Sequence, residues 1–198
     1  RFTINDFHGK KRWLSVPEIL TYSSNIGTAK MALDVGTEGQ KFYLERLGLL
    51  QQASIEQPEV GAPLSPSRWS DISTMTISYG HGIAVSSLQV VDAVSTLVNG
   101  GIRRPVTLLK QRSQIPIAGT RVLAADTSDR MRMLMRQVVT DGTGRNAGAP
   151  GYLVGGKTGT AEKLMNGGYH KEQVIASFVG TFPVDKPRFV ILAMLDEP

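Results

Sequence analysis

The residues whose types and spacing could do chemistry lie in two short segments far apart in the sequence. The first segment holds Ser23 and Asn25, and the second holds Lys157, Thr158 and Gly159. A lysine can supply a fixed positive charge beside a reacting centre, and strand N–H groups can stabilise a developing oxyanion. A serine can relay a proton, while asparagine and threonine side chains can bind an amide and a carboxylate. The two segments are therefore candidates for one shared site.

Each segment also has a plainer interpretation. Ser-Ser-Asn can simply cap a helix, and Lys157 can be a solvent-facing strand lysine beside a turn. Gly159 favours the functional interpretation, because a glycine after Lys-Thr leaves room for a substrate backbone against the strand edge. The order of the segments and their different settings, a helix start and a strand, favour a shared site.

A phosphate-binding pattern overlaps the lysine segment. Residues 151–158 fit G-x-x-x-x-G-K-[ST], and residues 192–197 resemble the apolar, acid-ended strand that holds magnesium in such ATPases. In those proteins the loop follows a strand and the lysine opens a helix that binds phosphate. Here residues 144–150 are turn material, and the turn signals at 166–168 favour a hairpin. A nucleotide-binding module therefore stays only as the less favoured alternative.

Composition limits the remaining classes. The 198 residues are 41% hydrophobic and 20% charged, with a net charge of +5, which is typical of a soluble domain. No basic run interleaved with aromatics is present, so no nucleic-acid partner is predicted. The chain has no cysteine, and its three histidines lack metal-ligand spacing, so we expect no disulfide, metal or cofactor. The longest apolar run, 189–195, is strand-sized, too short to span a membrane.

The first 150 residues are predicted to be mainly helical. Apolar residues recur at helical spacing in the two most regular segments, and capping residues or glycines bound the others. We expect helices that begin near Ser15, run from Asn25 to a stop at Gly36, and span residues 38–47, 88–99 and 128–140.

Residues 151–198 are predicted to be an antiparallel set of strands. The expected strands are 152–163, 173–182 and 189–195, with a tight turn at 166–168 between the first two. The continuous apolar run of the last strand predicts burial on both faces. The expected fold class is therefore α/β (α+β), with helices packed on one antiparallel sheet.

Four segments resemble the class B penicillin-binding proteins, in the same order over nearly the whole chain: residues 23–27, 68–72, 78–82 and 155–161. The division-type transpeptidase that crosslinks septal peptidoglycan is the most similar type. The resemblance implies a serine β-lactamase/transpeptidase-like fold and a catalytic domain at the periplasmic face of the inner membrane, with a single-pass anchor outside these residues. It also implies acyl-enzyme chemistry on a D-alanyl-D-alanine stem peptide, β-lactam binding, and contact with the division and cell-wall machinery.

The resemblance also assigns roles to individual residues. Ser23 would relay a proton, Asn25 would contact the substrate amide, and Lys157 would be the cationic strand position. Thr158 and Thr160 would lie near the substrate carboxylate. The backbone N–H of Thr160 would form half of the oxyanion hole.

Three further site residues are expected from the same resemblance. Gly159 would allow the substrate to approach the strand closely. Tyr79 and His81 would lie in a loop near the cleft, where substrate contact and simple packing are both open.

The family nucleophile is the serine of Ser-x-x-Lys, which should lie several dozen residues before Ser23. No serine in the chain has a lysine three positions later. We therefore expect a partial domain over residues 1–198, incomplete at both ends and inactive by itself. The alternatives are a penicillin-recognising sensor that binds without reacting, or a β-lactamase, for which we identify no water-activating base.

Overall fold

The computed structural model describes residues 3–111, 117–165 and 168–198. Its elements follow one another along the chain as helices first and a sheet last. They are α1 (Val16–Tyr22), α2 (Asn25–Arg46), α3 (Asp71–Ser78), α4 (Ser87–Val98), β1 (Ile102–Arg103), β2 (Thr120–Arg121), α5 (Ala125–Thr140), η1 (Arg145–Ala147), β3 (Gly155–Met165), β4 (Gly168–Phe182) and β5 (Phe189–Asp196).

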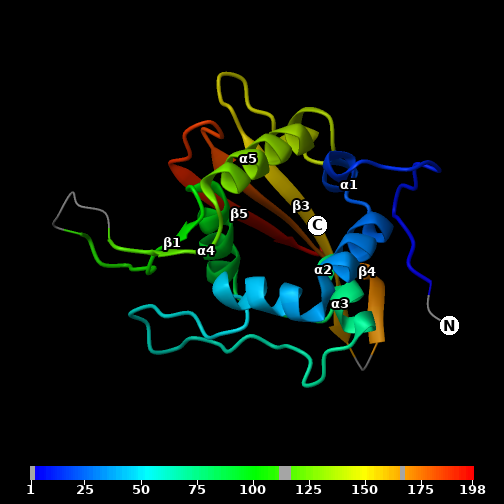
Figure 1. The fold of residues 1–198 in the computed structure, drawn as a ribbon, viewed down its shortest axis with the longest axis horizontal. Helices are drawn as coiled ribbons and strands as arrows, with labels where there is room; N and C mark the ends of the chain where they lie inside the picture. Colours follow the sequence, from blue (N-terminus) through cyan, green and yellow to red (C-terminus); the bar gives the residue numbers. More distant parts are fainter. Residues whose placement is uncertain (1–2, 112–116, 166–167) are drawn as a thin grey trace.

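The sheet has three antiparallel strands in the order β3-β4-β5, and β1 and β2 form a separate short pair. Lys157 lies opposite Val179, and Phe182 lies opposite Phe189. Helix α5 packs against β3, α4 packs against β5 and β4, and α2 packs on α3 beyond them (Figure 1). The predicted mixture of helices and antiparallel strands is confirmed. Of the predicted turn, residues 166 and 167 lie outside the described part of the chain.

The prediction that β5 is buried on both faces is wrong. Phe189, Ile191 and Leu195 are 55%, 53% and 60% exposed. The strand lies at one end of the sheet order, and within the described residues it pairs only with β4. An apolar run shows that a strand could be buried, but burial depends on the elements that cover it.

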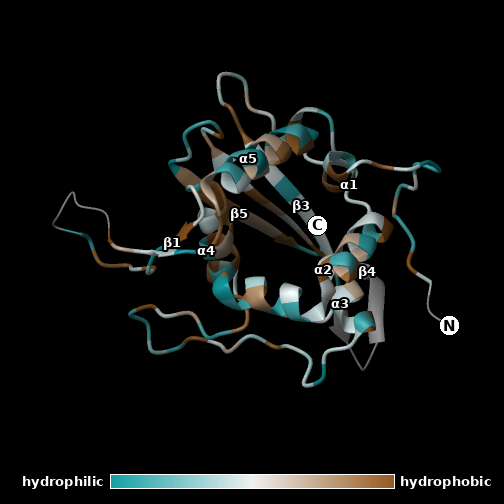
Figure 2. Ribbon diagram, in the orientation of Figure 1, coloured by the Kyte–Doolittle hydropathy of each residue, from teal (hydrophilic) through white to brown (hydrophobic). Residues whose placement is uncertain are grey.

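Helix α5 supplies the central part of the core. Val138 is fully buried and Met135 and Val139 nearly so, at the spacing that predicted this helix. Hydrophobic and hydrophilic residues alternate along the helix, as expected when one face rests on a sheet (Figure 2). The Nη1 of Arg136 donates to the carbonyl of Val154 at 2.8 Å, which joins the helix to the start of β3.

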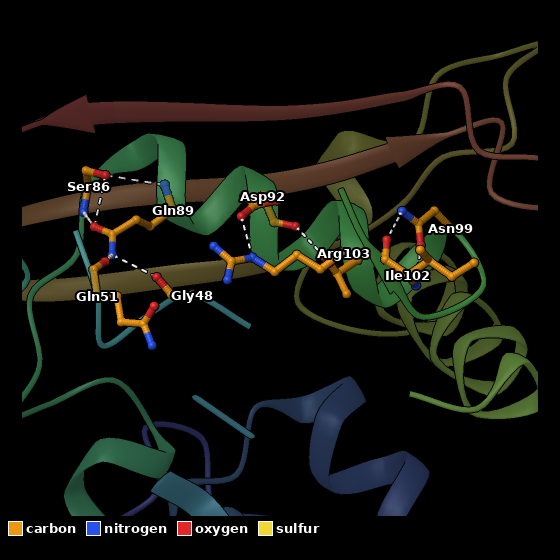
Figure 3. A network of polar contacts seen from close by, with 9 residues as sticks. Gly48, Gln51, Ser86, Gln89, Asp92, Asn99, Ile102 and Arg103 are labelled. Carbon is orange, nitrogen blue, oxygen red and sulfur yellow. Dashed lines mark hydrogen bonds and ion pairs between the residues drawn. The ribbon is translucent and has the colours of Figure 1, made fainter. Parts of the chain in front are cut away.

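The start of α4 is attached to the loop after α2 by one buried side chain. Gln89 is 2% exposed, and its Oε1 accepts the Ser86 N–H at 3.0 Å. Its Nε2 donates to the carbonyls of Gly48 and Gln51, at 3.0 and 2.8 Å (Figure 3). Ser86 and Gln89 form a capping box, and the same amide satisfies two loop carbonyls.

Helix α2 joins the two helices predicted on either side of Gly36. That glycine has φ 78° and ψ 161°, so it interrupts the helix with a kink. Asn25 was predicted to cap the helix, but Ser24 is the capping residue and Asn25 is the first helical one. The capping box expected at Ser15 is present.

Candidate active site

The structure brings the two chemically active segments together. The Nζ of Lys157, on β3, donates a hydrogen bond of 2.8 Å to the Oγ of Ser23, which is 134 positions away in the sequence. Ser23 lies between α1 and α2, so the contact joins the helical layer to the sheet. The catalytic roles of both residues stay predictions.

Ser23 has a left-handed backbone conformation, with φ 56° and ψ 51°. For a residue with a side chain this conformation costs about 1 kcal/mol or more. The end of α1 maintains it, because the N–H groups of Ser23 and Ser24 donate to the carbonyls of Leu20 and Ile19 at 3.2 and 3.0 Å. The helix end thus places the Ser23 hydroxyl toward β3.

Asn25 is also held in place. Its Nδ2 donates to the carbonyl of Asn5 at 3.0 Å, which fixes the orientation of the side-chain amide. With one N–H engaged, Oδ1 can accept a hydrogen bond from a ligand amide. The sequence had not indicated a role for Asn5. The next residue, Asp6, contacts the same turn.

Burial changes the acidity of Lys157. Loss of solvent around its half-buried ammonium lowers its pKa from 10.5 to about 8. Its Nζ also donates to the carbonyl of Thr158 at 3.0 Å. Both acceptors are neutral oxygens, so neither neutralises the ammonium group, and its positive charge can attract an anionic ligand. At neutral pH the side chain is still mainly protonated.

Thr158 is joined to a loop that the sequence had not indicated. Its Oγ1 and that of Thr143 are 2.7 Å apart, and the Thr143 N–H donates to the carbonyl of Thr21 at 3.2 Å. Thr143 thus connects α1 with β3 beside the site. A lone threonine between two glycines carries no sequence signal for such a role.

Gly159 lies on β3, the first strand in the sheet order, opposite Ser177 of β4. A Cβ at position 159 would be 2.7 Å from Ser177 Oγ, and that hydroxyl donates to the Gly159 carbonyl at 3.2 Å. Lys157 and Gly159 share one face of β3, since side chains alternate along a strand. Thr160, the next residue, is exposed. Within the described residues β3 pairs only with β4, which leaves its other edge for a ligand backbone.

Tyr79 and His81 lie together just after α3. Their rings meet edge to face with centroids 5.5 Å apart, and the His81 N–H donates to the carbonyl of Thr76 at 3.0 Å. Burial raises the pKa of Tyr79. Substrate contact by this pair stays a prediction.

The geometry disfavours the phosphate-binding alternative. Lys157 lies inside β3, and β3 runs antiparallel to β4, whereas a phosphate-binding lysine opens a helix. Within the described residues, no group of three or more metal-ligating side chains is placed to hold an ion. No helix in that part of the chain has the length and apolarity needed to cross a membrane.

Comparisons with known proteins agree with this geometry. The family model of the penicillin binding protein transpeptidase domain matches residues 2–198. The chain is 40% identical over 205 residues to the probable peptidoglycan D,D-transpeptidase FtsI of Caulobacter vibrioides, covering 99% of this chain and 35% of that protein. It is 36% identical over 203 residues to stage V sporulation protein D of Bacillus subtilis, covering 96% and 31%.

Solved structures are similar as well. The transpeptidase domain of Burkholderia pseudomallei penicillin-binding protein 3 has a TM-score of 0.88 at 37% identity, covering 93% of this chain and 57% of that one. Penicillin-binding protein 3 of Mycobacterium tuberculosis, complexed with aztreonam, has a TM-score of 0.86 at 32% identity, covering 93% and 45%. This chain therefore belongs to the penicillin-binding protein transpeptidase family. It spans about a third of the length of the curated relatives it matches.

Proposed function

We propose that the protein carrying this chain is a division-type peptidoglycan D,D-transpeptidase that crosslinks stem peptides through an acyl-serine enzyme. The observation that carries the proposal is the 2.8 Å contact between Lys157 and Ser23, beside an edge of β3 that pairs with no strand in the described part of the chain. A cation, a hydroxyl and a free strand edge are what an acyl transfer on a peptide carboxyl terminus requires.

The nucleophile in this proposal is the serine of a Ser-x-x-Lys segment outside these residues. Its Oγ attacks the carbonyl of the penultimate D-alanine, and its proton passes through Ser23 to the amine of the departing D-alanine. An amine of a neighbouring peptide then attacks the acyl-serine ester and forms the new amide, while the ester bond breaks and the serine Oγ takes up the proton that the amine loses. Lys157 stabilises the negative charge that develops, and the backbone N–H of Thr160 contributes to the oxyanion hole.

Substrate binding is assigned to the other predicted residues. Asn25 binds the substrate amide, while the hydroxyls of Thr158 and Thr160 bind the terminal carboxylate. Gly159 admits the substrate backbone beside β3, and Tyr79 lines the approach.

The setting and the partners belong to the same proposal. We place the domain at the periplasmic face of the bacterial inner membrane, held by a single-pass anchor outside these residues and working with the division machinery. The name of the Caulobacter relative, a probable peptidoglycan D,D-transpeptidase, supports a role in cell-wall synthesis. The aztreonam complex of the Mycobacterium protein supports β-lactam binding.

A fluorescent penicillin tests the proposal. We expect stoichiometric covalent labelling of the full-length protein, at least about 100-fold slower labelling of Lys157→Ala, and none of the isolated 198-residue chain. Labelling of the isolated chain would show that the nucleophile lies within it. A full-length protein that is acylated but does not crosslink stem peptides would instead be a penicillin-recognising sensor.

A further inference from the structure

The carboxylate of Asp6 lies against the turn that carries Ser23 and Ser24. Both of its oxygens are 3.0 Å from the Oγ of Ser24, and Oδ1 also accepts the backbone N–H of Ile26 at 3.0 Å. Asp6 comes from the extended segment before α1, so it binds the start of α2 from outside the helix.

These contacts fix the direction of the Ser24 hydroxyl. Ser24 is 5% exposed, and its Oγ accepts the Gly27 N–H at 3.0 Å as the cap of α2. A hydroxyl has one hydrogen, and the Ser24 hydroxyl donates it in a hydrogen bond to the Asp6 carboxylate. The lone pairs of Ser24 therefore stay directed at the helix N-terminus, and the carboxylate adds the charge that such a terminus favours.

Ser24 in turn determines where Ser23 lies. The backbone of Ser23 is left-handed, and the N–H of Ser24 contributes to the contacts that end α1. A shift of Ser24 would release this conformation and move the Ser23 hydroxyl away from Lys157. The adjacent carbonyl of Asn5 holds Asn25 from the same side. One short segment thus holds both members of the Ser-x-Asn wall.

We propose that Asp6 is a positioning residue of the transpeptidase site, which sets the hydroxyl of Ser23 through Ser24; this inference rests on the proposed function. Asp6 makes no contact with the reacting atoms. Its negative charge matters: an isosteric amide can keep an acceptor at the Oδ1 position, but it puts an N–H₂ group in place of Oδ2 beside the Ser24 hydroxyl and removes the charge at the helix N-terminus.

The test is the pre-steady-state acylation of full-length Asp6→Asn by fluorescent penicillin. We expect the acylation rate constant to fall by about tenfold or more, because small displacements of a reacting group reduce rates strongly. The penicillin dissociation constant should change by less than about threefold, since binding groups stay in place. In a Ser24→Ala background the further loss should be much smaller, as expected for two residues acting in series.

The matched control is Ser86→Ala. It removes a cap of the same kind from α4, a helix that carries neither Ser23 nor Asn25, and should lower the melting temperature without lowering the acylation rate constant. Equal acylation of wild type and Asp6→Asn would overturn the inference, as would a loss that Ser86→Ala reproduces. Full additivity with Ser24→Ala would also contradict it. Failure of the wild type to be acylated would instead reject the proposed function.

Discussion

Lys157 carries a positive charge but is partly buried, with neutral oxygens as its hydrogen-bond partners. Burial removes the water that would stabilise the charge. Its lowered pKa, about 8, is the result. Sequence reasoning assigned the charge and missed the burial, because only the fold places Ser23, between α1 and α2, against Lys157 on β3.

The first prediction concerns the pH dependence of acylation. If the cation is required, the second-order rate constant for penicillin acylation should fall as pH rises through 8, by about tenfold for each further unit. In Lys157→Arg the alkaline decline should disappear, since arginine stays charged, although the rate is lower throughout. A rate that rises through pH 8 would show instead that the neutral lysine acts as a base.

The same pKa predicts the opposite trend for stability. Between pH 8 and 10.5 the unfolded chain binds the lysine proton more tightly than the folded one. The contribution of Lys157 to the free energy of unfolding therefore rises over this window as pH increases. The melting temperature of wild type relative to Lys157→Arg should rise between these pH values. A relative fall would mean that the alkaline loss of acylation is simple unfolding.

Gly159 gives the second prediction. Its added methyl group would meet Ser177 and would face the same side as Lys157. We expect Gly159→Ala to lower both the melting temperature and the acylation rate constant, and Gly159→Ala with Ser177→Ala to restore the melting temperature alone. Recovery of acylation in the double variant would show that the glycine serves only the sheet.

At the scale of elements, helices with regular apolar spacing were predictable, and so were their interruptions. Val138 and Val139 follow the periodicity of α5, and Gly36 marks the kink of α2. Helix α3 was missed because its eight residues form too short a pattern, although Ser70 before Asp71 is a capping signal.

The limits of prediction at the site have a common physical cause. Motif order predicted that the segments of Lys157 and Ser23 line one site, because both carry recognisable residue types; the hydrogen bond between the two side chains was not predicted. The contacts of Asp6, Thr143 and Ser177 were not predicted either, since each depends on which distant element packs beside it. A side chain of this kind can serve several local roles, so its contact with a distant element becomes visible only in the folded structure.

The third prediction concerns the kink of α2. Gly36→Ala places a side chain at φ 78° with no atom within 4 Å of the new methyl group, so only backbone strain opposes it. The free energy of unfolding should fall by about 1–3 kcal/mol, because φ 78° with ψ 161° is a backbone conformation that essentially only glycine adopts. Gly61→Ala, also with open space around the added group but without positive φ, should be neutral or slightly stabilising. Urea denaturation of the two variants makes the comparison, and equal stabilities would contradict the strain.

The fourth prediction concerns the attachment of α4. Gln89→Ala leaves the carbonyls of Gly48 and Gln51 without their partner (Figure 3). The free energy of unfolding should fall by about 3 kcal/mol, since unsatisfied buried groups cost about 1–3 kcal/mol each. The exposed Gln137, on α5, is the matched control, and its change to alanine should alter stability by less than about 0.5 kcal/mol. Similar losses in both variants would show that water replaces the amide.

At the scale of the whole molecule, the sheet exposes apolar side chains along β5. Ile191 and Leu195 are more than half exposed, and apolar patches of this kind promote association. We expect the isolated 198-residue chain to self-associate, and Ile191→Lys to raise the monomer fraction measured by light scattering. Leu108→Lys, on an exposed loop elsewhere, should leave that fraction unchanged. A monodisperse monomer of the unaltered chain at high concentration would contradict this expectation.

The sequence separation of Ser23 and Lys157 also determines when the site can form during synthesis of the chain. With 134 positions between them and synthesis at about 5–20 residues per second, the lysine emerges roughly 7–27 seconds after the serine. Helices α1 and α2 can form during that interval, because their caps are local. The two segments of the site can meet only after the lysine has emerged, so no ligand can bind between them before that time.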